Sequence, residues 1–167
     1  KKRCEWAKDE PNTTYHDDEW GVPLHDDVGL FEFLILEGAQ AGLSWRTILN
    51  RRDGYRIAFS NFDVVAVSKY TQNHVKKLLQ NKDIIRNKLK INSAINNAKQ
   101  FIKIQQEFGS FDEYLWGFVN HKPIKNKFKK HSDLACSSII SEKLSQDLKK
   151  HGFTFVGPII CYSLMQA

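Results

Sequence analysis

The sequence is poor in the features that mark secreted and membrane proteins. Its three cysteines, Cys4, Cys136 and Cys161, are too few and too widely spaced for a disulfide framework. No run approaches the roughly 18 apolar residues of a membrane span. No signal peptide is recognisable. We therefore expect a cytoplasmic protein that makes no contact with a membrane.

Repeats, low-complexity tracts and proline-rich linkers are also missing, and strand-like alternation is nearly absent. Apolar residues recur at helical spacing, which predicts one all-α domain over residues 1–167, a helical bundle. Capping residues predict helices that begin after Asp26, Ser44, Asp63, Thr71, Ser110 and Ser141, a long helix within 86–109, and a last one from Pro158. The first of these should run to about Gly42. The chain starts without methionine and ends on the uncapped stretch "CYSLMQA", so we expect further residues beyond Ala167.

Charge is distributed unevenly along the chain, whose net charge is +6. Residues 1–44 hold four Lys/Arg and ten Asp/Glu, whereas the remainder holds 21 Lys/Arg and nine Asp/Glu. A basic second part fits a polyanionic partner such as nucleic acid. A solvated lysine surface explains the same numbers, so charge alone leaves both interpretations open.

The stretch "VKKLLQNKDIIRNKLKINSAINNAK" predicts a helical hairpin with a polar turn. Residues 81–103 contain six Lys/Arg and one acid, Asp83. Because the first N–H groups of a helix are unpaired, such a turn can present them to a phosphate. The segment resembles the helix-hairpin-helix element of DNA repair proteins, although Asp83 stands near the place of the usual glycine. An ordinary pair of antiparallel helices is the alternative.

The stretch "LILEGAQAGLSW", residues 34–45, places a carboxylate after an apolar run. Glu37 follows Leu34, Ile35 and Leu36, and Trp45 lies nearby in the sequence. One interpretation is a helix that turns its polar side to water. The other is a part-buried anion, which is stable only when it is paired or hydrogen-bonded.

Six short motifs, which follow one another along the chain, together carry a resemblance to a known family. They are "CEW", "YHDDEWGVP", "LEGAQAGLSW", "IIRNKLKI", "WGFVNHKP" and "GFTFVGPIICYSLMQA". With this spacing the chain, from Arg3 to Ala167, resembles the DNA-3-methyladenine glycosylase I family of the helix-hairpin-helix superfamily. The resemblance implies an all-α base-excision repair enzyme that binds double-stranded DNA and releases free 3-methyladenine. It further implies a monomer acting at the bacterial nucleoid.

The resemblance also assigns roles to residues near the N-terminus. It places Glu37 against the flipped base as the catalytic residue, among the aromatic side chains of Trp6, Tyr15, Trp20 and Trp45. Core packing explains each aromatic residue taken singly, but the group beside a carboxylate favours a base-binding pocket. The expected divisions of the domain are an N-terminal segment and pocket over 1–62, a hairpin-containing DNA-binding part over about 71–108, and C-terminal helices over 110–167.

Contacts with DNA are expected from two places. The loop at Gly42 and Leu43 is a candidate to fill the gap left by the flipped base, although Leu43 could equally be a core residue. Lys82, Arg86 and Lys88 flank the hairpin turn and are expected to contact phosphates. The sequence "GFTFVGPII" holds no acid where a catalytic aspartate could follow, and no lysine stands in an apolar setting near the hairpin. These observations agree with the resemblance, which implies a glycosylase without lyase activity.

Cys4 and His16 match two ligands of the structural zinc that the resemblance implies. The two further ligands, a histidine and a cysteine, are expected beyond Ala167, because a structural zinc site needs four. Two other functions remain open on the sequence alone. One is a non-catalytic helix-hairpin-helix protein that binds DNA, and the other is a zinc-stabilised helical interaction protein.

Overall fold

The structure is a computed structural model that describes residues 2–167, and these residues form helices and loops without a strand. This confirms the predicted all-α fold. The helices are α1 (Asn12–Asp18), α2 (Asp27–Gln40), α3 (Trp45–Leu49), α4 (Arg52–Ala58), η1 (Ser60–Phe62), α5 (Val64–Ser68), α6 (Gln72–Gln80), α7 (Lys88–Phe108), α8 (Phe111–Gly117), η2 (His131–Asp133), α9 (Ile139–Lys150) and α10 (Pro158–Gln166). None of them has the length and hydropathy needed to cross a membrane.

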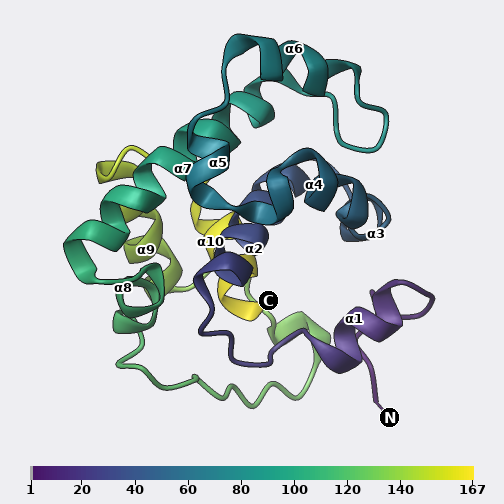
Figure 1. Cartoon of the computed structure of the whole chain (residues 1–167). Coiled ribbons are helices and arrows are strands. Elements are labelled where there is room, and N and C mark those ends of the chain that lie inside the picture. Colours follow the sequence, from purple (N-terminus) through teal and green to yellow (C-terminus); the bar gives the residue numbers. More distant parts are fainter. Residues whose placement is uncertain (1) are drawn as a thin grey trace.

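Helix α2 lies at the centre of the molecule beside α10, as Figure 1 shows. Residues 30–39 of this helix are all buried. A helix that is apolar on every side must be covered on every side. The long helix α7 and the short helix α8 also pack on α2. The continuous apolar run in the sequence therefore marks the central helix of the bundle.

The predicted caps hold most of the helix starts. Asp26, Ser44, Asp63 and Ser110 each accept a hydrogen bond from a backbone N–H in the first turn that follows. Pro158 occupies the first turn of α10. The carboxylate of Asp27 accepts bonds from the amides of Phe111 and Asp112, and so joins the start of α2 to the start of α8.

Some predicted boundaries are wrong by a few residues. Helix α2 ends at Gln40 because Gly42 adopts a positive φ of 78° in the loop that follows. Helix α7 begins at Lys88, where the side chain of Asn87 caps it, and not at Arg86. Helix α9 is capped by Ser138 and not by Ser141, which lies inside its first turn. Leu89, an apolar residue in the first turn of α7, is 71% exposed.

Two α-helices, α1 and α4, were not predicted. The residues that precede them, Pro11 and Arg51, make no side-chain capping bond. Without a recognisable cap, a helix of about two turns carries little signal in the sequence, and packing against its neighbours must stabilise it.

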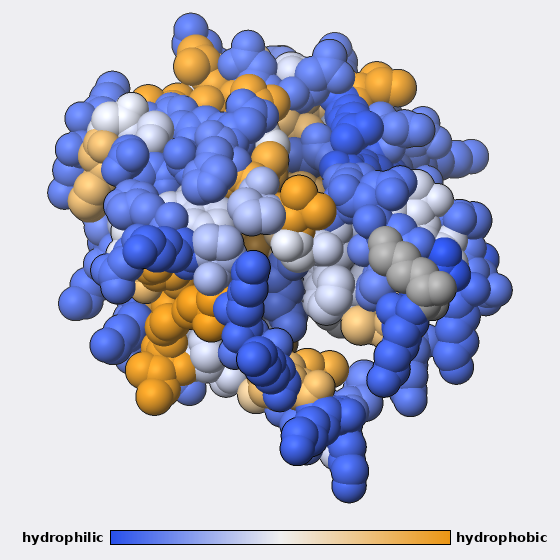
Figure 2. All heavy atoms as spheres, turned by 90° about the horizontal axis from the view of Figure 1, so that it is seen from below, coloured by the Kyte–Doolittle hydropathy of each residue, from blue (hydrophilic) through white to orange (hydrophobic). Residues whose placement is uncertain are grey.

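A long segment between α8 and α9 stands apart from the core. Residues 120–136 are all exposed and contain five lysines. In Figure 1 this segment runs along the bottom of the molecule. Figure 2 views the molecule from that side and shows a mostly hydrophilic face with scattered apolar patches.

Candidate active site

Glu37 lies inside the molecule, in the third turn of α2, with only 4% of its surface exposed. Its Oε2 atom has no hydrogen-bond partner among the described residues. Burial raises the pKa of this carboxyl group to about 8. The interpretation of Glu37 as a solvated residue on a helix surface is therefore wrong.

Glu32, five residues earlier on the same helix, shows how unusual this is. It is also buried, but its carboxylate accepts hydrogen bonds from both Arg52 and Arg56. A buried carboxylate normally requires such partners, because losing water without replacement costs free energy. Of the two buried glutamates, only Glu37 has an oxygen available for a ligand.

Four aromatic side chains predicted for the site lie together. The rings of Trp6 and Trp20 meet edge to face with their centroids 5.4 Å apart, and Trp6 lies 6.2 Å from Tyr15. The centroids of Tyr15 and Trp45 are 5.4 Å apart. The structure thus brings together rings from the N-terminal segment, α1 and the start of α3. We call Trp6, Tyr15, Trp20 and Trp45 the aromatic cluster.

Two members of the aromatic cluster carry unsatisfied polar atoms. The hydroxyl of Tyr15 and the indole N–H of Trp45 are buried and have no partner among the described residues. Burial and the nearby charge of Glu37 both raise the pKa of Tyr15, so its hydroxyl keeps its proton. Buried polar atoms are seldom left unpaired in folded proteins. Together with Glu37, these atoms offer a hydrogen-bond acceptor, a hydroxyl and an N–H donor beside flat aromatic surfaces.

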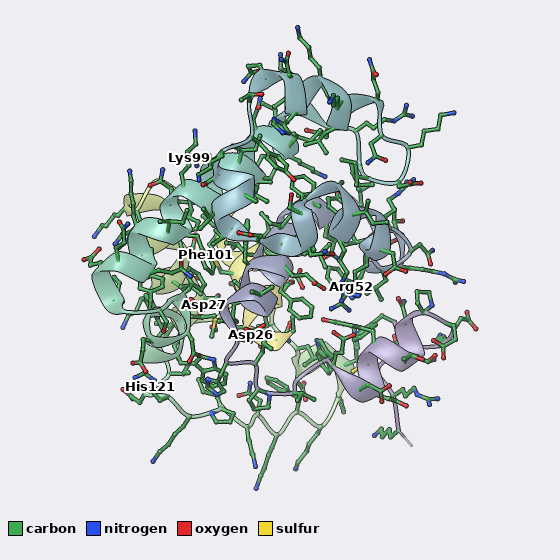
Figure 3. The ribbon with its side chains drawn as sticks, viewed as in Figure 1. Asp26, Asp27, Arg52, Lys99, Phe101 and His121 are labelled. Carbon is green, nitrogen blue, oxygen red and sulfur yellow. The ribbon has the colours of Figure 1, made fainter. Side chains whose placement is uncertain are left out.

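Arg52 ties the part of the chain that carries the cluster to the rest of the molecule. Its guanidinium donates two hydrogen bonds to Glu19, just after α1, and another to Glu32 of α2. It also lies 5.2 Å from the centroid of the Phe33 ring. Figure 3 shows Arg52 extending from α4 toward α1. This arrangement holds α1, and with it Tyr15 and Trp20, against α2.

The loop between α2 and α3 presents Leu43 to solvent. Gly42 has a positive φ, and Leu43 is 39% exposed. The alternative that Leu43 is a core residue is therefore wrong. An exposed apolar side chain on a short loop beside the aromatic cluster is available to contact DNA.

The predicted hairpin residues lie around the connection between α6 and α7. Lys82, Arg86 and Lys88 are all exposed. Lys82 and Arg86 line an open hollow of about 540 Å³ together with Arg51, whose guanidinium donates to the carbonyl of Lys82. Arg51 was missed in the sequence because it is 30 or more residues away from the turn it joins.

The backbone of the turn is seated on α4. A Cβ added to Gly54 would lie 2.4 Å from the carbonyl oxygen and 2.7 Å from the Cβ of Asp83. The amide of Ile85 donates to the hydroxyl of Tyr55. The Cβ of Asp83 therefore packs toward α4.

Cys4 and His16 lie close together in the structure. The amide N of Cys4 is 3.4 Å from Nε2 of His16, and Nδ1 of His16 is 3.0 Å from a carboxylate oxygen of Asp17. In the described part of the chain, however, no group of three or more His, Cys, Asp or Glu side chains could hold a metal ion. Residues 2–167 therefore contain no complete set of zinc ligands.

Comparison with known proteins adds independent information. The model of the methyladenine glycosylase family matches residues 6–167. DNA-3-methyladenine glycosylase 1 of Escherichia coli is 44% identical over 167 residues, which cover 99% of this chain and 89% of that protein.

Solved structures agree with the sequence matches. A crystal structure of 3-methyladenine DNA glycosylase I superposes with a TM-score of 0.96 at 42% identity, covering 99% of this chain and 92% of the other. The structure of 3-methyladenine DNA glycosylase I from Staphylococcus aureus that describes the basis of 3-methyladenine recognition gives a TM-score of 0.94 at 38% identity. It covers 96% of this chain and 85% of the other.

Proposed function

The chain belongs to the methyladenine glycosylase family, and we propose that it excises 3-methyladenine from alkylated double-stranded DNA by hydrolysing the N-glycosidic bond. The observation that carries the proposal is Glu37, a buried carboxylate with an unpartnered oxygen beside the aromatic cluster. A protein that only binds DNA has no use for such an arrangement. The glycosylase activity of its relatives also favours the enzyme over the non-catalytic alternative.

The lesion itself explains why one carboxylate is enough. Methylation at N3 gives the adenine of the nucleoside a positive charge, so the base departs as a neutral molecule and needs no general acid. Water forms a bond to C1′ of the sugar while the glycosidic bond breaks. The base takes the bonding electron pair, and the proton of the water passes to solvent. The enzyme therefore has to extrude the nucleotide, select it and stabilise positive charge.

Each residue of the site has a role in this scheme. The rings of Trp6, Tyr15, Trp20 and Trp45 stack on or surround the base, and their negative faces favour a cation. Glu37 accepts hydrogen bonds from the exocyclic N–H group. The positive charge of the lesion lowers the pKa of Glu37 from its raised value, so binding of the cation favours the carboxylate form.

Contacts with the duplex come from the two segments beside the site. Leu43, with Gly42, fills the gap that the flipped nucleotide leaves. Lys82, Arg86 and Lys88 bind phosphates around the hairpin turn. All these residues belong to one chain, so we propose that the enzyme acts as a monomer.

The absence of lyase activity needs one correction to its argument. We expected no lysine in an apolar setting near the hairpin, but Lys90 is partly buried and burial lowers its pKa. Its ammonium group is held by hydrogen bonds to the carbonyl oxygens of Ala39 and Ala41. A lysine fixed in this way does not serve as a free nucleophile, which agrees with a monofunctional glycosylase.

Zinc belongs to the proposal as a structural group only. Cys4 and His16 would supply two ligands. Nδ1 of His16 contacts Asp17, and Nε2 would ligate the metal in place of the hydrogen bond that it accepts here from the Cys4 amide. Bound zinc would add rigidity to the segment that carries Trp6 and Tyr15, and no step of the reaction involves it. Metal analysis of protein that extends beyond Ala167 should give about one zinc per chain, lost in Cys4→Ser. A zinc-free and fully stable extended protein contradicts this part of the proposal.

The direct test is to measure the bases released from methylated DNA. Wild-type protein should release free 3-methyladenine without cutting the strand. Glu37→Gln places an amide donor where an acceptor is needed, so we expect release to slow by about tenfold or more while the protein stays folded. No released base from folded wild-type protein would support the non-catalytic DNA-binding alternative. Normal release by Glu37→Gln would remove Glu37 from the site.

A further inference from the structure

Lys90 reaches from the first turn of α7 to the end of α2. Its ammonium nitrogen lies 2.8 Å from the carbonyl oxygen of Ala39 and 2.6 Å from that of Ala41. These bonds join residues that are 51 and 49 positions apart in the chain. Lys90 is partly buried, unlike Lys88 in the same turn, which is exposed.

A cation suits this position for two reasons. The last carbonyl groups of a helix have no partners within the helix, and the C-terminal end carries a partial negative charge. An ammonium group has three N–H donors and no acceptor, so it can satisfy both carbonyls at once. Lys90 therefore fixes the end of α2 more firmly than a neutral side chain could.

The carbonyl of Ala41 also begins the loop that presents Leu43. Ala41 leaves the helix with a ψ of 118°, and Gly42 then turns with a φ of 78°. The amide of Leu43 donates to Gln40 at 2.7 Å, and Ser44 caps the next helix. Lys90 is thus the side chain from another element that holds the first peptide group of this loop.

The other end of the connection is the hairpin. Lys90 donates its backbone N–H to the side chain of Asn87, the last residue before α7. The two segments proposed to contact DNA, the 41–43 loop and the turn at 81–87, are therefore joined through a single residue.

We infer that Lys90 is a positioning residue for base flipping, which holds the Ala41–Leu43 loop in the shape that lets Leu43 enter the duplex and registers this loop against the hairpin turn. The inference rests on the proposed glycosylase function. It makes Lys90 act through Leu43, and not on the base or on the phosphates.

A double-mutant cycle tests this directly. Single-turnover excision of 3-methyladenine from duplex DNA would be measured for wild type, Lys90→Met, Leu43→Ala and the double variant. We expect each single substitution to slow excision by about tenfold or more, and the double variant to be no slower than the slower single variant within about twofold. Binding of free 3-methyladenine should be unchanged in all four, because none of the substitutions touches the aromatic cluster.

Two further variants separate positioning from general stability and from charge. Lys90→Arg keeps a cation with several donors and should recover most of the excision rate. Lys99→Met removes the same charge from the same helix, but Lys99 points away from α1 and α3 (Figure 3), so its excision rate should stay at the wild-type value. Melting temperatures of all variants show whether each is folded.

Several results would overturn the inference. Multiplicative losses in the double variant would show that Lys90 and Leu43 act independently. Weaker binding of free base by Lys90→Met would place Lys90 at the base site. If Lys99→Met slows excision as much as Lys90→Met does, the effect comes from the loss of a positive charge and not from the position of Lys90. If wild-type protein releases no base, the proposed function is wrong. That result differs from independent effects of Lys90 and Leu43 in an active enzyme, which contradict only the inference about Lys90.

Discussion

At the scale of single residues, the burial of Glu37 makes stability depend on pH. The carboxyl pKa is about 8 in the folded protein and about 4.5 in the unfolded chain. Between these values the folded state holds a proton that the unfolded state releases. The contribution of Glu37 to the free energy of unfolding therefore falls as pH rises from 5 to 8, and levels off above that.

The glutamine in the Glu37→Gln variant cannot titrate. The free energy of unfolding of this variant should therefore lack the fall between pH 5 and pH 8 that Glu37 causes in wild type. We expect the variant and wild type to be similar in stability near pH 5, and the variant to be the more stable protein at pH 8. The gap should widen by at most about 1.4 kcal/mol per pH unit. Urea unfolding at pH 5, 6, 7 and 8 measures it. If the difference in free energy of unfolding between the variant and wild type does not change with pH, the Glu37 carboxylate is hydrogen-bonded or paired in solution, which contradicts the prediction.

Trp45 gives a second prediction at the same scale. Trp45→Ala removes a ring that packs on Tyr15, so binding of free 3-methyladenine should weaken by about 1–3 kcal/mol. Trp45→Phe keeps an aromatic face and should retain most of the affinity. Calorimetric titration with the free base provides the measurement.

Trp116 is the matched control for this experiment. It is also partly buried, but it stacks on His25 and donates to the carbonyl of Leu24, away from the aromatic cluster. Trp116→Ala should lower the melting temperature and leave base affinity unchanged. If a folded fraction of Trp45→Ala binds base normally, Trp45 is a packing residue only.

At the scale of elements, α4 acts as the seat of the hairpin turn. Gly54→Ala would bring a methyl group against the backbone of Asp83, so the turn at 81–87 must shift. We expect a loss of about 1–3 kcal/mol in stability, and weaker duplex binding with unchanged affinity for the free base. Fluorescence anisotropy with labelled duplex and calorimetry with free base separate the two.

Gly117→Ala serves as the control for Gly54→Ala. It makes the same substitution in helix α8, where an added methyl group meets nothing within 4 Å. Its stability should be unchanged or slightly higher, because alanine favours a helix. Equal duplex affinity in both variants would show that duplex binding does not depend on the packing of the 81–87 turn against α4.

At the scale of the whole molecule, duplex binding should depend more on where the positive charges lie than on the net charge. Replacing Lys82, Arg86 and Lys88 with alanine should weaken duplex binding irrespective of sequence. It should reduce the slope of log affinity against log salt by about 1 for each lost phosphate contact. Binding of free base should survive.

The segment between α8 and α9 offers a control with the same change in net charge. Lys125, Lys127 and Lys129 are exposed residues of this segment. The segment runs along the bottom of Figure 1, whereas the connection between α6 and α7 lies near the top. Replacing these three lysines should leave the salt slope much closer to wild type. Equal slopes in the two triple variants would show that net charge, and not the hairpin, determines binding.

Sequence patterns alone predicted the helical class and most of the helix starts, and they drew attention to Glu37 as a carboxylate in an apolar run. Caps such as Asp26 and Ser44 act within one turn, so their effect is local and can be read from neighbouring residues. The helices α1 and α4 lack such caps, and only their packing creates them. The start of α9 was misplaced for a different, local reason. Ser138 and Ser141 lie within one turn of each other, and their mutual hydrogen bonds make Ser138 the cap.

The tertiary structure decided which of these residues meet and which stay unpaired. Glu32 and Glu37 look alike in the sequence, but arginines from α4 reach only Glu32, and Glu37 is left with an open oxygen. In the sequence Lys90 is one of several basic residues of the hairpin. Only the fold places its ammonium group against the carbonyl oxygens at the end of α2. Hydrogen bonds of this kind join residues 20 to 51 positions apart, and spacing in the sequence carries no information about such distances in space.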